Sequence, residues 1–376
     1  MTEQLRPHYS RRMLVICPFP QGVAAGQRLK YEQYFDDWRT QGWEIDVSSY
    51  MDMSMWKIVY DKGQYPKKIK GVLHGHLRRL RDLFTVGRYD LVYVFMWVTP
   101  FGTTIMERLI RSLAKRIIFD VEDNVLVEQN LPKELNPNSL VRLVKGPGKA
   151  RYLIEKADHI ITSSPFLNDY CLAINEFKQC TYISSSVDTN RFVPATPYRN
   201  DKLVVIGWTG TFSSKIFLDL LRDVFIRLAE RVPFKLKVIG NFDYEMPGID
   251  IEVIRWTKEN EVEDLQSFDI GVYPLPINDW VLGKSGLKAI QYMAFGLPCV
   301  ATDVGTTPLL ITHHKNGMLV KSDDEWVDAL ELLVKEPALR RKLGQAARES
   351  VVANYSLTAI GTQYCEVLEK VMAKSI

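Results

Sequence analysis

Short apolar runs alternate with helical segments along most of this chain. RMLVICPFP at 12–20, YDLVYVFM at 89–96 and RIIFDVED at 116–123 each have the length, apolar content and bounding residues of a buried strand. Helical segments are expected between them, at 27–41 and in TPFGTTIMERLIRSLAK, which starts at 99. Strands separated by helices predict a parallel sheet covered on both faces. Such sheets bind ligands beyond the carboxyl ends of their strands.

The same alternation restarts after PATPYRNDK at 194–202, a polar stretch with two prolines. A chain of 376 residues is long for one hydrophobic core, so two domains are expected. We predict an α/β chain of two doubly wound, parallel-sheet domains that face a cleft. The first domain is predicted at 1–195, the linker at 196–202 and the second domain at 203–355. A C-terminal helix at 356–376 is a candidate to pack back on the first domain.

The composition is typical of a globular protein without a membrane span. The chain is 46% hydrophobic and 25% charged, and a formal net charge of only +3 gives no reason to expect a nucleic-acid partner. No apolar run reaches the roughly 18 residues that a membrane-spanning helix needs, and the polar start MTEQLRPHYSRR is unlike a secretory signal. Five scattered cysteines without a CxxC pair favour a reducing, cytoplasmic compartment and no metal.

One segment, at 61–82, is much more basic than the rest of the chain. It holds two Asp and seven Lys or Arg residues: Lys62, Lys67, Lys68, Lys70, Arg78, Arg79 and Arg81. Apolar residues fall at helical spacing through this segment and just beyond it: Ile69, Val72, Leu73, Leu77, Leu80, Leu83 and Phe84. Two interpretations stay open. The segment is either a solvated helix face packed on its domain, or a surface over Lys62–Arg81 for anionic lipid or an anionic acceptor.

Three glycine-containing loops lead from a predicted strand into a predicted helix. The first is Gly22–Arg28, and the second is GWTGTFSSK, which includes Gly210 and Thr211 and ends at Lys215. Glycines let a ligand approach the backbone, and the N–H groups at a helix start bind anions. Both loops are therefore candidates to hold a phosphate, although each is also compatible with an ordinary turn.

The third loop belongs to GKSGLKAIQYMAFGLPCVAT at 283–302. The backbone of Ser285, Gly286 and Leu287 lies at a predicted helix start and can bind phosphate. Lys284 and Lys288 are one helical turn apart and could share a face of that helix. Solvated lysines are the alternative interpretation.

These motifs follow one another in a recognisable succession. SFDIGVYPLP, GKSGLKAIQYMAFGLPCVATDVG, KNGMLV and LRRKLGQAARESVVANYSL occur in this order between 255 and 357. This region resembles the C-terminal domain of retaining glycosyltransferases of the GT-B fold, in the large sucrose-synthase and mannosyltransferase-like family (family 4). PFPQGVAAGQR, ADHIITSSPFLND and YISSSVDTNRFVP resemble the first domain of that family more loosely. The resemblance implies two Rossmann-like domains, with the nucleotide-sugar on the second and the acceptor against the first.

The resemblance also assigns roles to cations and exposes departures. Lys215 takes the position of a lysine that grips the donor diphosphate, while Trp208 stands near the position of an arginine, so Lys284 is a candidate to replace the missing cation. The family commonly has two glutamates, the first for the donor sugar and the second for the ribose. Here Gly283 replaces the first and Gln291 the second. Sugar recognition is then expected from other groups, with Asp279, Trp280 and the main chain as candidates.

Further candidates lie on both predicted domains. Asp120 and Glu122 end a predicted strand and could position substrate hydroxyls or act on the acceptor proton, or simply cap the next loop. Asp120 is assigned to the catalytic set with Lys215 and Lys284, and Glu122 to the acceptor side with Arg28. Trp256 either flanks the nucleotide base or packs against the domain. Gly22, Gly210, Thr211, Ser285, Gly286, Leu287, Lys288, Gln291 and Trp256 complete the predicted donor-binding set.

We therefore expect a metal-independent, retaining glycosyltransferase of the hexosyltransferase type. It would move a sugar from a nucleotide-diphosphate donor to a glycan, lipid-linked or other acceptor in surface-glycan (polysaccharide) biosynthesis. No cofactor is expected. The protein would be cytoplasmic or peripheral at the inner face of the membrane. Two alternatives stay open: a catalytically impaired nucleotide-sugar-binding protein that has lost its glutamates, and a nucleotide-sugar epimerase.

Overall fold

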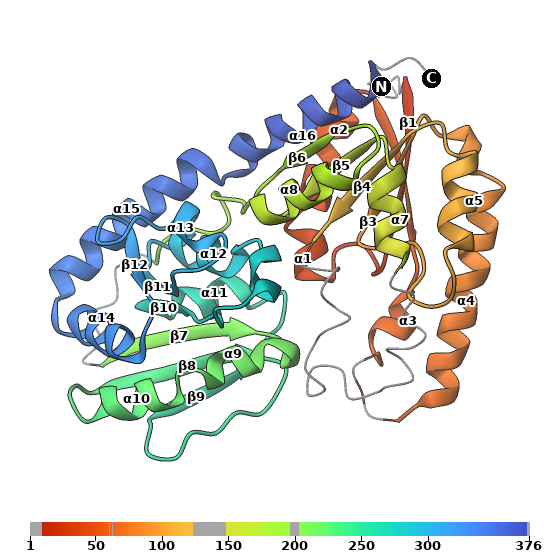
Figure 1. Cartoon of the computed structure of the whole chain (residues 1–376). Helices are drawn as coiled ribbons and strands as arrows, with labels where there is room; N and C mark the ends of the chain where they lie inside the picture. Colours follow the sequence, from red (N-terminus) through yellow and green to blue (C-terminus); the bar gives the residue numbers. More distant parts are fainter. Residues whose placement is uncertain (1–9, 60, 62, 123–147, 196–202, 374–376) are drawn as a thin grey trace, which may run out of the picture. The chain divides into compact units, whose positions relative to one another are not determined.

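The structure, a computed structural model, describes residues 10–59, 61, 63–122, 148–195 and 203–373 (Figure 1). It consists of two compact units. Unit 1 is Met1–Ser184 with Gly361–Ile376, and unit 2 is Ser185–Ile360. The predicted linker at 196–202 and Lys62 of the basic segment lie outside the described residues. Within the described ranges, every helix is either too short or too polar to span a bilayer.

Unit 1 contains a sheet of six parallel strands in the order β2-β1-β3-β4-β5-β6. The strands are β1 Arg11–Cys17, β2 Trp43–Ser49, β3 Leu91–Phe95, β4 Ile117–Val121, β5 His159–Thr162 and β6 Cys180–Tyr182. Its helices are α1 Ala25–Arg28, η1 Glu32–Tyr34, α2 Phe35–Thr40, α3 Met53–Trp56, α4 Tyr65–Leu83, η2 Val86–Arg88, α5 Ile105–Leu113, α7 Gly148–Lys156 and α8 Pro165–Ile174. The prediction of a parallel sheet with interleaved helices is confirmed.

The single helix predicted at 27–41 is wrong, because the segment divides into α1, η1 and α2. Polar side chains in this segment turn inward and bond the loop before it. The Gln27 amide donates to the carbonyl of Phe19 at 3.0 Å and to Glu32 Oε1 at 2.5 Å. Glu32 in turn accepts the backbone N–H of Gly22 at 2.8 Å. These bonds favour a broken helix that follows the loop.

Unit 2 repeats the architecture with the order β12-β11-β10-β7-β8-β9. The strands are β7 Val204–Gly210, β8 Phe234–Gly240, β9 Ile251–Arg255, β10 Ile270–Tyr273, β11 Cys299–Thr302 and β12 Gly317–Val320. The helices are η4 Phe212–Ser214, α9 Lys215–Asp219, α10 Arg222–Ala229, α11 Glu261–Gln266, η5 Asp279–Gly283, α12 Leu287–Ala294, α13 Thr307–Leu310, α14 Asp323–Lys335 and α15 Pro337–Asn354. The strand order reverses direction between β7 and β10, and ligands of such sheets bind where this reversal occurs.

The last helix, α16 Leu357–Met372, contributes its larger part to unit 1. There the ring of Tyr364 packs against Tyr34 at 5.0 Å and Trp38 at 5.8 Å between centroids. Arg11 of β1 also forms an ion pair with Glu369 at 2.5 Å. Aromatic pairs of this kind add to the burial of their apolar surface, so this helix is part of the unit 1 core.

The backbones of α12 and α15 approach each other closely in unit 2. Gly296 ends α12 in the left-handed region, with φ of 70°, and its N–H donates to Met293 O at 3.0 Å. A Cβ on Gly344 of α15 would lie 2.0 Å from the carbonyl oxygen of Gly296. A side chain larger than hydrogen therefore cannot be accommodated at Gly344 without moving one of the two helices.

Gly344→Ala is expected to destabilise unit 2 by about 1–3 kcal/mol, the usual range for overpacking. This range is the cost of the steric clash, and it is reduced by the roughly 1 kcal/mol that alanine gains over glycine in helix propensity. We expect the clash to outweigh that gain. The measurement is the urea midpoint of unfolding, with the exposed neighbour Gln345→Ala as the control. Equal midpoints in the two variants would show that α15 can shift without cost.

Candidate functional site

The candidate site of unit 2 lies at the carboxyl ends of β7 and β10. These strands are neighbours, with Ile270 and Gly271 of β10 paired to Ile206 and Gly207 of β7. The loop after β7 leads into α9, and the segment after β10 leads through η5 into α12. The hydroxyl of Tyr292 on α12 accepts the N–H of Thr209 at 2.9 Å, which fixes α12 against the end of β7. The fold thus brings the second and third predicted loops together.

The loop after β7 is bonded internally. Thr211 and Ser214 form a reciprocal capping box, in which the Thr211 N–H donates to Ser214 Oγ at 3.1 Å. The N–H of Phe212 donates to the side-chain oxygen of Asn241 at 3.0 Å. A Cβ on Gly210 would meet the Trp208 ring at 2.3 Å. Gly210 is therefore required by packing, and the Thr211 and Phe212 N–H groups already have partners within the protein.

Three lysines converge on the start of α9. Lys215 is its first residue, Lys288 Nζ lies 3.3 Å from Ser214 Oγ, and Lys284 Nζ lies 5.7 Å from the centre of the Phe217 ring. They come from α9, from α12 and from the segment between η5 and α12. Clustered cations raise the local positive potential and bind anions such as a diphosphate.

An aromatic ring lies beneath each of these lysines. The Nζ atoms lie 5.5 Å from the Tyr244 ring for Lys215, 4.9 Å from Trp280 for Lys284 and 4.8 Å from Trp208 for Lys288. The rings attract the ammonium groups and hold them in place without neutralising their charge. Trp208, which stands where the family resemblance places an arginine, is fully buried and serves as the platform for Lys288.

The prediction that Lys284 and Lys288 share a face of one helix is wrong. Lys284 has extended backbone angles, with φ of −75° and ψ of 137°, and α12 begins only at Leu287. Gly286 precedes the helix with φ of 76°, and a Cβ there would meet the Leu310 side chain at 2.4 Å. This sharp turn separates the two lysines. Gly286 has no side chain to cap α12, and the first turn of this helix carries the positive end of its dipole.

The remaining candidate residues of unit 2 lie near α12, with one exception. Ser285 lies just before α12 and is buried, at 8% exposure. Gln291 lies within α12 and is also buried, at 6% exposure. Gly283 is buried at the end of η5, next to Lys284. Trp256 is half-buried after β9, the edge strand of the sheet, two places from β7, and its N–H donates to Gly240 O at 3.0 Å. The structure thus groups all of these candidates except Trp256 around α12.

The candidate residues of unit 1 belong to the loop after β1 and to the end of β4. Gly22 is in the left-handed region, with φ of 80°, and its N–H is bonded by Glu32. Arg28 ends α1 and is buried at 8% exposure. The carboxylate of Glu122 lies over this loop, with Oε2 3.0 Å from the position of a Cβ on Gly26. Glu32 was not among the predicted site residues, since its sequence position indicates only a helix.

Asp120 is not at a surface, as its expected catalytic role would require. It is fully buried, pairs with Lys30 Nζ at 2.5 Å and accepts the hydroxyl of Tyr93 at 2.5 Å. Burial raises the pKa of Asp120 above its ordinary value, while Lys30 and Tyr93 act to lower it. Every residue of β4 is buried, because a central parallel strand is covered on both faces. Strand alternation therefore gives Asp120 no route to solvent.

Metal ligands are not gathered anywhere in the part of the chain that the structure describes. No group of three or more His, Cys, Asp or Glu side chains there has the arrangement of a metal site.

Known proteins resemble the chain both in sequence and in fold. Residues 204–336 match the family model "Glycosyl transferases group 1". The chain is 37% identical over 154 residues to N-acetyl-alpha-D-glucosaminyl L-malate synthase of Bacillus anthracis, covering 38% of this chain and 39% of that protein. It is 27% identical over 216 residues to a Corynebacterium glutamicum protein, the GDP-mannose-dependent monoacylated alpha-(1-6)-phosphatidylinositol monomannoside mannosyltransferase, covering 50% and 55% of the two chains.

Solved structures match almost the whole chain. Sucrose-phosphate synthase from Thermosynechococcus elongatus superposes with a TM-score of 0.75 at 16% identity, over 97% of this chain and 100% of that one. Anabaena Alr3699/HepE in complex with UDP-glucose superposes with a TM-score of 0.64 at 13% identity, over 96% and 100%. At such identities the likeness establishes the fold. Residues 204–336 thus match the glycosyl transferases group 1 family, and the chain as a whole has the two-domain GT-B glycosyltransferase fold.

Proposed function

We propose that the chain is a retaining, metal-independent glycosyltransferase that uses a nucleotide-diphosphate sugar. The observation that carries this proposal is the convergence of Lys215, Lys284 and Lys288 on the start of α9. It lies within the segment that matches the glycosyl transferases group 1 family, at the edge of the sheet where ligands of such folds bind. One structural neighbour, Alr3699/HepE, was solved in complex with UDP-glucose, which is a sugar nucleotide of this class.

The lysines supply what the departing diphosphate needs. Cleavage of the sugar–phosphate bond moves its electron pair to the leaving phosphate oxygen, which gains negative charge. Lys215, Lys284 and Lys288 stabilise that charge, and the first turn of α12 adds the positive end of its helix dipole. Retention without a dedicated nucleophile implies attack of the acceptor hydroxyl on the face that the diphosphate leaves, and a departing phosphate oxygen takes the acceptor proton.

The donor sugar requires a substitute for the first family glutamate. Gly283 has no side chain to contact the sugar, and it ends the short helix η5 that also carries Asp279 and Trp280. Trp280 packs on Phe217 with 5.3 Å between ring centroids and lies under Lys284. We assign sugar recognition to Asp279, Trp280 and the main chain of η5. Gln291 replaces the second glutamate as a partner of the ribose hydroxyls, because its amide both donates and accepts hydrogen bonds.

On unit 1, we assign the acceptor to the Gly22–Arg28 loop together with Glu122. Their proximity supports this assignment, because the Glu122 carboxylate lies directly over Gly26. Asp120 is given a supporting role, in which it holds Lys30 and Tyr93 behind this loop. The name of the Corynebacterium relative includes a phosphatidylinositol monomannoside, and this supports a lipid-linked or glycan acceptor. We place the reaction in surface-glycan assembly on the cytoplasmic side of the membrane.

The proposal can be tested in a thermal-shift screen of UDP-, GDP-, dTDP-, ADP- and CMP-sugars, followed by hydrolysis and transfer assays on the sugars that bind. We expect one nucleotide class to raise the melting temperature and its sugar to be hydrolysed slowly without acceptor, with retained anomeric configuration and undiminished activity in EDTA. Binding without turnover would favour the nucleotide-sugar-binding alternative. A changed sugar released without acceptor would favour the epimerase. Loss of turnover in EDTA would exclude the metal-independent mechanism.

A further inference from the structure

Helix α4 carries an apolar stripe on its exposed face. The residues of this stripe are spaced by three or four, which aligns them along one side of the helix. Their exposed fractions are 71% for Tyr65, 60% for Ile69, 59% for Leu73, 61% for Leu77, 46% for Leu80 and 83% for Phe84. Soluble proteins seldom expose so many large apolar side chains in one continuous row without using them to bind something. Val72 and Leu83, two other apolar residues of the segment, pack against the domain, whereas the six residues of this stripe do not.

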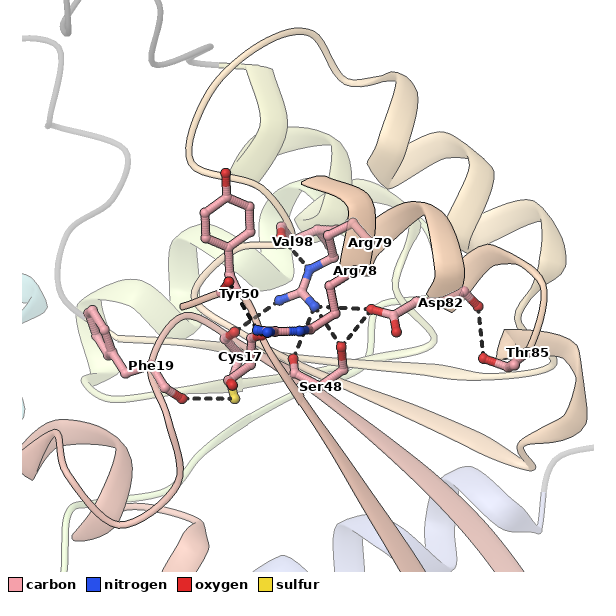
Figure 2. A network of polar contacts seen from close by, with 10 residues as sticks. Cys17, Phe19, Ser48, Tyr50, Arg78, Arg79, Asp82, Thr85 and Val98 are labelled. Atoms are coloured by element: carbon pink, nitrogen blue, oxygen red, sulfur yellow. Dashed lines mark hydrogen bonds and ion pairs between the residues drawn. The ribbon is translucent and has the colours of Figure 1, made fainter. Parts of the chain in front are cut away.

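Polar anchors on the opposite face fix this orientation. Arg79 is fully buried and donates to the carbonyls of Cys17 at 2.9 Å, Ser48 at 3.0 Å and Val98 at 2.7 Å, as Figure 2 shows. It also pairs with Asp82 at 3.0 Å. Rotation of α4 to bury its apolar stripe would break this whole set of bonds. The stripe is therefore exposed because the buried arginine holds the other face of the helix against the sheet.

Helix α5 packs beside α4 and adds apolar surface of its own (Figure 1). Ile105, Leu109 and Leu113 recur every four residues along α5 and are 62%, 40% and 46% exposed. Both of these adjacent helices thus expose an apolar stripe. We call the six α4 residues of the stripe and these three α5 residues the α4–α5 surface.

The charges of α4 favour one kind of occupant. Six Lys or Arg residues lie in Tyr65–Leu83, and the single acid there, Asp82, is buried against Arg79. Lys67, Lys70 and Arg81 are exposed. Anionic lipid headgroups complement such a helix, because cations at the edge of an apolar stripe attract a negatively charged bilayer. Two copies of the chain meeting through this face would instead bring their cations together.

We infer that the α4–α5 surface binds an anionic membrane, with the apolar stripe inserted among the headgroups and the cations of α4 in contact with lipid phosphates. Arg79 connects this surface to the proposed acceptor loop, since it bonds the carbonyl of Cys17, the last residue of β1, from which that loop begins. Membrane binding itself does not depend on the proposed function. Only the delivery of a lipid-linked acceptor to this loop rests on it.

Vesicle co-sedimentation of the full chain tests the inference. We expect binding to vesicles of phosphatidylglycerol and phosphatidylcholine, and at least about tenfold weaker binding to phosphatidylcholine alone, because the cations contribute to the affinity. Leu73→Ser/Leu77→Ser should reduce binding to the anionic vesicles by about tenfold or more, by removing inserted apolar surface. Ile226→Ser/Val352→Ser is the matched control, since it removes two exposed apolar side chains of unit 2, at 46% and 45% exposure.

Variants that remove charge distinguish electrostatic attraction to the vesicle from insertion of apolar side chains into it. Lys70→Gln/Arg81→Gln should weaken binding at low salt and flatten its salt dependence, while Leu73→Ser/Leu77→Ser should leave the salt dependence of the remaining binding intact. The inference is overturned if the leucine variant binds as wild type does, or if the wild type is a stable dimer in sedimentation velocity that this variant dissociates. Nucleotide-sugar hydrolysis in solution is measured in parallel. A wild-type chain that binds vesicles but hydrolyses none of the nucleotide sugars would refute the proposed function alone.

Discussion

Lys284→Ala is expected to lower kcat by about 100-fold or more, the usual effect of removing one group that stabilises developing negative charge. In our mechanism the Lys284 ammonium faces the diphosphate as its bond to the sugar breaks. The expected loss is therefore in kcat, while donor binding weakens less, because charge increases on the diphosphate only in the transition state. The measurement is a steady-state transfer or hydrolysis assay with the donor identified in the thermal-shift screen.

Two comparisons make this result specific. Lys315→Ala removes an exposed lysine from a turn of the same unit and should keep full activity. Lys284→Arg keeps the charge over the Trp280 ring and should recover part of the lost rate. The melting temperature of Lys284→Ala should stay close to that of wild type, because the side chain is only half-buried. Wild-type kcat in Lys284→Ala would remove this residue from the mechanism.

Arg79→Met is expected to destabilise unit 1 by about 3–5 kcal/mol, the range seen when one partner of a buried ion pair is removed. The substitution leaves Asp82 as a buried charge without its cation and removes the donor from the carbonyls of Cys17 and Ser48. Hydrogen exchange is the suitable measurement, because the chain has two units and a single melting curve would combine them. We expect faster exchange in β1 and β2.

The control for this substitution lies on the same helix. Arg81→Met makes the same chemical change at an exposed position and should alter stability by less than about 0.5 kcal/mol. Arg79→Lys should not restore stability, because one ammonium cannot reach the three separate carbonyls that the planar guanidinium bonds. Equal hydrogen exchange in Arg79→Met and Arg81→Met would show that the network is dispensable.

The fold could be predicted from the sequence because it depends on local patterns. The apolar runs that become β1, β3, β4 and β7 are short and bounded by polar or turn residues, and the segments between them have helical periodicity. Two parallel sheets follow from that alternation alone. Lys30 and Asp120 are different, because they are distant in sequence and form an ion pair only once the sheet exists. No local pattern reveals such a pair, so the sequence alone places Asp120 in the catalytic set.

The orientation of helix α4 also depends on contacts between residues that are distant in sequence. Its periodicity identifies an amphipathic helix but not which face turns inward, and an apolar stripe ordinarily faces the core. Arg79 reverses this default, because it donates to carbonyls on three separate segments of the chain and pairs with Asp82. At the unit 2 site, the sequence indicated the lysines through their glycine loops. The rings of Phe217 and Tyr244 that hold Lys284 and Lys215 became visible only in three dimensions.

The division of unit 1 between the two ends of the chain has a consequence for biosynthesis. Tyr364 and Glu369 complete contacts with Tyr34 and Arg11, so the core of unit 1 stays unfinished on the ribosome until translation has passed 369. Unit 2, at 185–360, is continuous and can close first. Unit 1 is therefore expected to be completed last, because it needs a segment that is synthesised after all of unit 2.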